Sequence, residues 1–142
     1  MKKLVAIALL YLTSSAVFAA EVVLELGSND AMQFDKNEFR VPAGSTVTLN
    51  LTHTGSLAAN VMGHNFVLLK PGTDIQTFGL AAVNAAANGY IPTPDDVIAN
   101  TEIIGGGEST SITFEAPAAG TYDFICSFPG HFAIMKGKFI VE

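Results

Sequence analysis

Apolar and polar residues alternate in short runs along most of the chain beyond residue 20. In the clearest run, STVTLNLTH (45–53), threonine and asparagine alternate with the residues Val47, Leu49, Leu51 and His53. Successive side chains of a strand point to opposite faces, so this run predicts a strand with one buried face. Similar short runs occupy residues 22–27, 64–70, 110–115, 121–126 and 136–142.

Turn-forming residues separate the runs. Glycine, proline and serine gather in VPAGS (41–45), HTGS (53–56), GGGES (105–109) and APAAG (116–120). Short strands at this spacing are typical of an antiparallel sandwich or barrel with Greek-key connections. A chain of 142 residues has room for one such all-β domain.

One segment, residues 73–96, breaks the alternation. It is rich in alanine, Thr73 and Asp74 can cap a helix at its start, and glycine and proline follow. We therefore predict a short helix and loop inserted between two strands. Whether this insert has a function or only connects two strands stays open, because long loops are only sometimes functional.

The first 19 residues have the layout of a secretory signal peptide. Lys2 and Lys3 precede a short apolar run, and small residues extend to Ala19. The apolar run is too short to cross a bilayer comfortably as an anchor. We predict cleavage after Ala19 and a single exported domain, residues 20–142, with no membrane-spanning segment.

The charge balance argues against two classes of partner. Loss of Lys2 and Lys3 with the signal takes the 7 basic residues to 5 against 13 acidic ones, a net charge of −8. Such a charge disfavours binding to nucleic acid and to anionic membranes.

Cys126 is the sole cysteine of the chain. Exported proteins usually form disulfides, and one cysteine cannot form one within the chain. A lone thiol there is buried and inert, bound to another molecule, or occupied by a metal or by catalysis. Alternation places Cys126 on the same face as Phe124, so we expect its thiol inside the protein at the end of a strand.

Two histidines and a methionine accompany this cysteine. CSFPGHFAIMKG (126–137) puts His131 and Met135 on one interstrand loop with Cys126, and His64 begins a distant strand that can end at the same pole. Taken alone, such a cysteine or methionine is more often an ordinary core residue, and each histidine could be an ordinary polar residue at the end of a strand. Together they match a blue copper site, in which two histidines and a cysteine lie in a plane with a weak axial methionine. Structural zinc sites, in contrast, seldom use methionine.

Two stretches resemble the copper-binding loops of the azurins, a family of small blue-copper cupredoxins: NVMGHNFVL (60–68) and CSFPGHFAIMKG (126–137). GSNDAMQF (27–34) and LTHTGSLAANVMGHN (51–65) are also similar to azurins, so the resemblance covers nearly all of the exported chain. LAAVNAAANGYIPTPDD (80–96) of the insert and APAAGTYDFIC (116–126) are closer to the auracyanins, azurin-like cupredoxins of photosynthetic bacteria. The resemblance implies a cupredoxin-type Greek-key fold.

The resemblance also implies one copper ion per chain. His64, Cys126 and His131 match the in-plane ligands, and Met135 matches the axial one. Gly63 matches a residue whose carbonyl approaches copper from the opposite side, which the absence of a Cβ permits.

Residues around the ligands take roles by the same resemblance. Asn65 matches a residue that ties the two ligand loops together, with Ser127 as its hydrogen-bond partner. The backbone amides of Asn65 and Phe128 are candidate donors to the thiolate. His53 matches a largely buried histidine that is not a ligand, so we expect a structural role and leave open a pH-linked effect on the potential.

The same resemblance implies that the imidazole edge of His131 reaches the surface, where electrons would enter and leave. The residues that match the apolar collar around it are Met32, Leu57, Met62, Phe128, Pro129 and Phe132. Exposed apolar patches commonly mark docking surfaces, and small interfaces suit carriers that must leave quickly. We expect redox donor and acceptor proteins to dock there transiently on a monomer, although each collar side chain could equally be packed in the core.

Three features depart from the azurin pattern. Val22 and the short turn VPAGST (41–46) occupy the regions of the azurin disulfide, a link that typically contributes about 2–4 kcal/mol. Phe66 stands where azurins commonly have tryptophan, and Asn100 stands where they often carry a surface histidine. None of these changes affects a predicted ligand.

These features predict a periplasmic one-electron carrier with a type 1 copper site, and not an enzyme. The alternative is a periplasmic copper-handling protein that uses the same ligands without a redox role. Such proteins often carry methionine- or histidine-rich tracts, which this sequence lacks. An enzyme is disfavoured because no third group orients Cys126 and His131, and one further histidine cannot supply a second copper centre.

Overall fold

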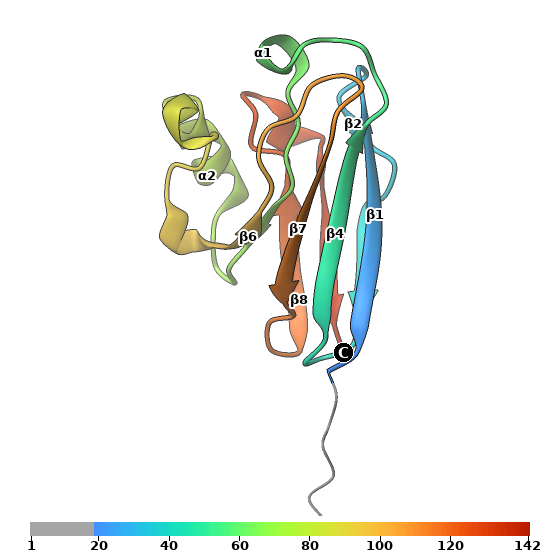
Figure 1. Ribbon diagram of the computed structural model, residues 1–142. Coiled ribbons are helices and arrows are strands. Elements are labelled where there is room, and N and C mark those ends of the chain that lie inside the picture. Colours follow the sequence, from blue (N-terminus) through green and yellow to red (C-terminus); the bar gives the residue numbers. More distant parts are fainter. Residues whose placement is uncertain (1–18) are drawn as a thin grey trace, which may run out of the picture.

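The chain forms two β-sheets that pack face to face in the computed structural model, which describes residues 19–142 (Figure 1). The first sheet has the strand order β2-β1-β4-β7 and contains β1 (Glu21–Asn29), β2 (Gln33–Phe34), β4 (Thr46–His53) and β7 (Ser109–Glu115). The second has the order β3-β9-β8-β5-β6 and contains β3 (Glu38–Val41), β5 (Val67–Leu69), β6 (Val97–Asn100), β8 (Gly120–Ile125) and β9 (Lys136–Val141). This architecture confirms the predicted β-sandwich. The predicted signal peptide, residues 1–19, lies outside the described residues except for Ala19.

Two strand pairs are parallel, which differs from the antiparallel sandwich expected from the sequence. β1 pairs in parallel with β4, and β3 pairs in parallel with β9. After β1 the chain crosses to the second sheet as β3 and returns as β4, and such a crossover lets two strands of one sheet run in the same direction.

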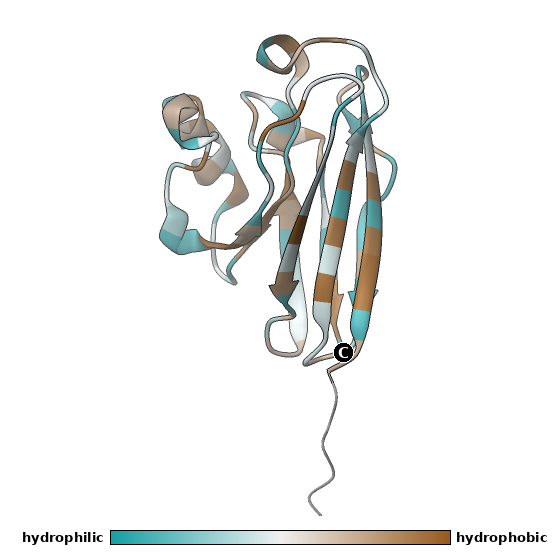
Figure 2. Cartoon of the chain, in the orientation of Figure 1, coloured by the Kyte–Doolittle hydropathy of each residue, from teal (hydrophilic) through white to brown (hydrophobic). Residues whose placement is uncertain are grey.

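β4 shows how the sequence pattern forms the core. Val47, Leu49 and Leu51 are fully buried, whereas the threonine and asparagine positions between them are partly exposed. Leu49 is flanked by Leu24 of β1 and Ile112 of β7. The resulting stripes of alternating hydropathy are visible along β1 and β4 in Figure 2. The alternation therefore predicted both the strand and its buried face.

The insert forms a lobe on one side of the sandwich, drawn in yellow in Figure 1. It contains the helix α2 (Ile75–Ala82) and the 3₁₀ turns η1 (Ala86–Asn88) and η2 (Pro94–Asp96). Asp74 caps α2 as predicted, because its side chain accepts a hydrogen bond from the amide of Thr77 at 2.7 Å. Phe78 and Ile91 pack against Ile125 of β8, so both faces of β8 are covered.

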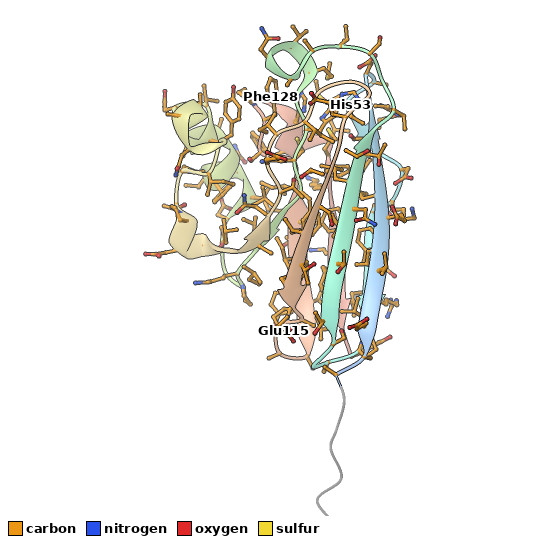
Figure 3. All side chains as sticks on the ribbon, viewed as in Figure 1. His53, Glu115 and Phe128 are labelled. Atoms are coloured by element: carbon orange, nitrogen blue, oxygen red, sulfur yellow. The ribbon has the colours of Figure 1, made fainter. Side chains whose placement is uncertain are left out.

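The site lies at one end of the sandwich. Phe128 and His53 lie at this end in Figure 3, and Glu115 lies at the opposite end. Two short elements that the sequence did not predict shape it: α1 (Ala59–Met62), before Gly63, and the 3₁₀ turn η3 (His131–Ala133). No helix within residues 19–142 has the length and apolar character that a membrane crossing requires.

Candidate metal centre

Three predicted ligands bring their donor atoms together. Sγ of Cys126 lies 3.8 Å from Nδ1 of His64 and 3.6 Å from Nδ1 of His131, and the two nitrogens are 3.2 Å apart. Cys126 follows β8 directly, His131 opens η3, and His64 follows α1. All three side chains are buried. Residues far apart in the sequence therefore form one compact donor triangle.

The triangle has the size that a bound metal ion requires. Protein nitrogen and sulfur ligands lie about 2.0–2.3 Å from a metal, so three such donors in one plane are about 3.5–3.8 Å apart. The observed separations of 3.2–3.8 Å are close to this range. Two imidazoles and one thiolate are also a set that copper prefers. The residues present therefore fit copper.

Hydrogen bonding orients His64 as a ligand. Its Nε2 lies 2.8 Å from the carbonyl oxygen of Asn29, an acceptor, so Nε2 carries the proton. Nδ1 is then unprotonated and its lone pair faces Cys126. This contact could not be predicted from the sequence, because Asn29 contributes a backbone atom to it.

Burial keeps the ligand histidines neutral. It lowers the pKa of His64 and, together with the repulsion between the two imidazoles if both were protonated, lowers the pKa of His131 to about 4. Both imidazoles are therefore available as ligands at neutral pH.

Burial has the opposite effect on the thiol. It raises the pKa of Cys126 to about 12, while hydrogen bonds from the backbone amides of Asn65 and Phe128 oppose the shift. These two amides are the hydrogen-bond donors to the sulfur that the resemblance to azurins predicted. In the metal-free protein the thiol is protonated, so metal binding must release a proton.

Gly63 and Met135 complete the group of predicted residues. The carbonyl oxygen of Gly63 lies 3.9 Å from Sγ of Cys126. A Cβ at position 63 would overlap the backbone carbonyl oxygen of Ala59 and would approach Phe128 to 2.8 Å, so packing requires glycine there. Met135 is buried in one cluster with Cys126 and Phe128.

Backbone hydrogen bonds fix the ligand loop. The amide of Cys126 donates to the carbonyl of Met135 at 2.9 Å, and the amide of Met135 donates to the carbonyl of His131 at 2.8 Å. Three predicted ligands are thus linked through their main chain, which restricts how far any one of them can move.

Asn65 and Ser127 join the two ligand-bearing segments, as the sequence predicted. The amide of Ser127 donates to Oδ1 of Asn65 at 2.8 Å, and Nδ2 of Asn65 lies 2.9 Å from Oγ of Ser127. Both residues are fully buried. Asn65 follows His64 and Ser127 follows Cys126, so the pair fixes two ligands relative to each other.

His53 is a buried neighbour and not part of the donor triangle. Its Nδ1 accepts a hydrogen bond from the amide of Gly55 at 3.0 Å, and its Nε2 donates to the carbonyl of Met62 at 3.0 Å. The ring lies 4.5 Å from the ring of His64, measured between centroids. This packing supports the structural role expected from the sequence.

Asp30 is a residue that the sequence analysis missed. Its carboxylate accepts hydrogen bonds from the amides of Ser56 and Leu57 at 2.8 and 3.2 Å, and it lies 3.8 Å from Nε2 of His53. The hydrogen bond from Ser56 is the main cause that lowers the pKa of Asp30. Asp30 thereby anchors the segment that leads to α1.

The predicted apolar collar is only partly exposed. Leu57 is 40% exposed, and four other members are half-buried: Met32, Met62, Pro129 and Phe132. Two expectations are corrected here: Phe128 is only 8% exposed, and His131, whose imidazole edge was expected at the surface, is only 2% exposed. The ring of Phe128 lies beside Tyr90 and His131, at centroid distances of 5.2 and 4.8 Å.

Two positions that depart from the azurin pattern do not belong to the donor triangle. Phe66 is fully buried, with its ring 5.3 Å from that of Phe124, so it belongs to the central core. Asn100 is exposed at the end of β6.

Comparisons with known proteins identify a copper-binding family. Residues 20–142 match the model of the family described as copper binding proteins, plastocyanin/azurin family. The chain is 49% identical over 126 residues to azurin-1 of Alcaligenes xylosoxydans xylosoxydans, covering 83% of this chain and 95% of that protein. It is 40% identical over 127 residues to auracyanin-A of Chloroflexus aurantiacus, covering 85% of this chain and 75% of that protein.

A solved structure shows the same likeness. The structure of auracyanin A, described as a "blue" copper protein from the green thermophilic photosynthetic bacterium Chloroflexus aurantiacus, superposes with a TM-score of 0.79 at 36% sequence identity. The alignment covers 87% of this chain and all of that one.

Proposed function

Because this chain belongs to the plastocyanin/azurin family of copper-binding proteins and is a blue copper electron carrier, we propose that His64, Cys126 and His131 hold its single copper ion. The observation that supports this assignment is the buried triangle of donors, with separations of 3.2–3.8 Å. When bound, copper supplies a one-electron couple between Cu(I) and Cu(II), since sulfur ligands favour the first and imidazole also serves the second.

The protein's own contribution is to hold the ligands still. The hydrogen bonds between Asn65 and Ser127 fix the two ligand segments to each other. The hydrogen bond from Nε2 of His64 to the carbonyl of Asn29 fixes the first imidazole. Ligands that move little between oxidation states impose a small reorganisation cost, which favours fast electron transfer.

We propose that Met135 and Gly63 complete the copper site beside the three donors of the triangle. The thioether of Met135 would be a weak sulfur donor, and the carbonyl oxygen of Gly63 would be a further weak oxygen neighbour. Their support is their place in the site: Met135 is buried with Cys126, and the Gly63 carbonyl lies 3.9 Å from the sulfur.

Electron-exchange partners are redox proteins, and we propose that they dock transiently around His131 on a monomeric carrier. Support comes from the exposed collar residue Leu57 and from the charge pattern. Residues 54–63, 75–94 and 127–135 contain no Asp, Glu, Lys or Arg, although the whole chain is strongly acidic. An uncharged surface permits close approach of a partner, and a small interface permits rapid release.

We further propose that residues 1–19 are a cleaved signal peptide and that residues 20–142 act as one domain in the periplasm. The layout of the first 19 residues supports this, and the family match begins at residue 20, directly after the predicted cleavage position. We also infer that the protein carries electrons without catalysing a reaction of its own.

A visible spectrum tests the copper assignment. The metal-free protein receives one equivalent of Cu(II), beside the variant Cys126→Ser as control. We expect an intense blue band in the natural protein and none in the variant, because the band arises from the thiolate–copper bond. A colourless copper complex of the natural protein would instead favour the copper-handling alternative.

A further inference from the structure

The insert of residues 73–96 contacts the His131 loop on both sides of His131. On one side, the ring of Tyr90 packs edge-on against Phe128, with centroids 5.2 Å apart and planes at 64°. Phe128 in turn lies 4.8 Å from the ring of His131. An aromatic contact thus extends from the insert, through Phe128, to a ligand.

The second contact involves Gly79 of α2 and Phe132 of η3. A Cβ at position 79 would overlap the ring of Phe132, so the helix and this ring are packed as closely as glycine allows. Phe132 also packs against the buried cluster that contains Phe78 of α2. Phe132 follows His131 directly, so this contact restrains the other side of the ligand.

A hydrogen bond links the insert to Asn65, which together with Ser127 joins the two ligand-bearing segments. Nδ2 of Asn65 lies 3.4 Å from the carbonyl oxygen of Gly89, while the same amide group also reaches Ser127. The insert therefore contacts the site through backbone as well as side chains.

Tyr90 has a backbone conformation that bulky residues rarely adopt. Its φ is +62°, and Met32 is the only other non-glycine residue with positive φ within residues 19–142. Both side chains pack against the cluster of Cys126, Phe128 and Met135. Such a conformation costs free energy and persists where surrounding contacts enforce it. The turn enforces it here, because the amide of Tyr90 donates to the carbonyl of Ala85 at 2.9 Å.

We propose that the insert is a brace for the His131 loop, in which Tyr90 and Gly79 act as positioning residues. Tyr90 packs against Phe128, and Gly79 allows the ring of Phe132 to pack closely against α2. These two rings flank His131 and restrict its movement. The role as a brace for an electron-transfer ligand rests on the proposed function. The packing itself is a property of the metal-free protein and is testable without copper.

Amide hydrogen exchange of the metal-free protein tests the brace. The reporters are the amides of His131, Ile134 and Met135, which donate within the loop at 3.0, 3.0 and 2.8 Å. In Tyr90→Ala we expect their exchange to accelerate about tenfold while β4 amides keep their rates, because local opening becomes easier. Tyr90→Phe retains the ring and should stay within about twofold of the natural protein. Leu80→Ala, on the exposed side of α2, is the matched control and should change nothing.

Gly79→Ala provides a second, independent test. Alanine is a better helix former than glycine, so if the contact between α2 and Phe132 does not restrain the His131 loop, the change should leave hydrogen exchange in that loop unaltered. A brace predicts that the added methyl displaces Phe132 and accelerates exchange of the same three amides about tenfold. The proposal is overturned if Tyr90→Ala leaves these amides unchanged, or accelerates them only together with β4.

The copper-loaded protein supplies a second readout. Tyr90→Ala should keep the blue band but slow electron self-exchange about tenfold, with recovery in Tyr90→Phe, since a looser ligand must rearrange more at each transfer. An unchanged self-exchange rate in Tyr90→Ala would count against the brace. Absence of a blue band from the natural protein would instead refute the proposed function, and the amide hydrogen-exchange experiment on the metal-free protein would remain valid.

Discussion

Asn65 and Ser127 form two mutual hydrogen bonds, at 2.8 and 2.9 Å, across 62 positions of sequence. Each residue directly follows a predicted copper ligand, so the pair sets the relative position of His64 and Cys126. Because both residues are fully buried, water cannot replace the bonds if one partner is removed.

The first prediction concerns this pair. Asn65→Leu should lower the free energy of unfolding of the metal-free protein by about 1–3 kcal/mol, since it leaves the buried amide of Ser127 without an acceptor. Ser127→Ala should cost only about 1 kcal/mol, because the hydrogen bond from the backbone amide of residue 127 to Oδ1 of Asn65 remains. Urea denaturation of both variants measures the difference. Equal losses of unfolding free energy in the two variants would mean that the hydrogen bond from the amide of residue 127 to Asn65 contributes nothing.

The second prediction concerns Met135. Met135→Leu should keep the blue band and raise the reduction potential, because loss of even a weak electron donor destabilises doubly charged Cu(II) more than singly charged Cu(I), while the three strong ligands remain. Voltammetry and a visible spectrum of the same sample measure both quantities. A fall in potential, or loss of the colour, would show that Met135 does not occupy the axial position.

The third prediction concerns the pH dependence of the metal-free protein. The pKa of Cys126 rises from 9.0 to about 12 on folding, mainly through burial. Between these values the unfolded chain releases the thiol proton and the folded chain retains it, so this group makes the protein less stable as pH rises from 9 to 12.

Urea denaturation at several pH values between 8 and 11 measures this effect, with Cys126→Ser as the control. Lysine and tyrosine titrate in both proteins, so only the difference between them reports on the thiol. We expect the natural protein to lose stability faster above pH 9 than the variant. Parallel curves would mean that the thiol ionises equally well in the folded and unfolded chains.

The sequence predicted those features that depend on local pattern. Strict alternation in β4 gave its buried face, and the spacing within residues 126–135 placed three predicted ligands on one loop. The resemblance to azurins added the partnership of Asn65 with Ser127, which the structure confirms.

Features that depend on long-range packing could not be predicted in the same way. The parallel pairing of β1 with β4 follows from the crossover between sheets, which alternation does not encode. Phe128 was expected at the surface, and Tyr90 of the insert covers it. The Asn29 carbonyl that orients His64 is a backbone atom, so its residue type carries no signal.

The fourth prediction concerns the docking surface. Leu57 is 40% exposed and lies in the segment that Asp30 anchors at the ligand end, because its own amide donates to the Asp30 carboxylate. Leu57→Glu places a charge on each of two copies that meet through this surface, and like charges brought together in an interface oppose association. Electron self-exchange at low salt should therefore fall about tenfold, which corresponds to about 1.4 kcal/mol.

Val23→Glu is the matched control for this prediction, since it adds the same charge elsewhere. Val23 is 64% exposed and lies on β1 near the end of the sandwich that carries Glu115, opposite the ligands (Figure 3). NMR line broadening in mixtures of oxidised and reduced protein measures self-exchange in both variants, and voltammetry checks that their potentials are unchanged. If Val23→Glu slowed the exchange as much as Leu57→Glu, net charge alone would explain the loss, and docking around His131 would have to be abandoned.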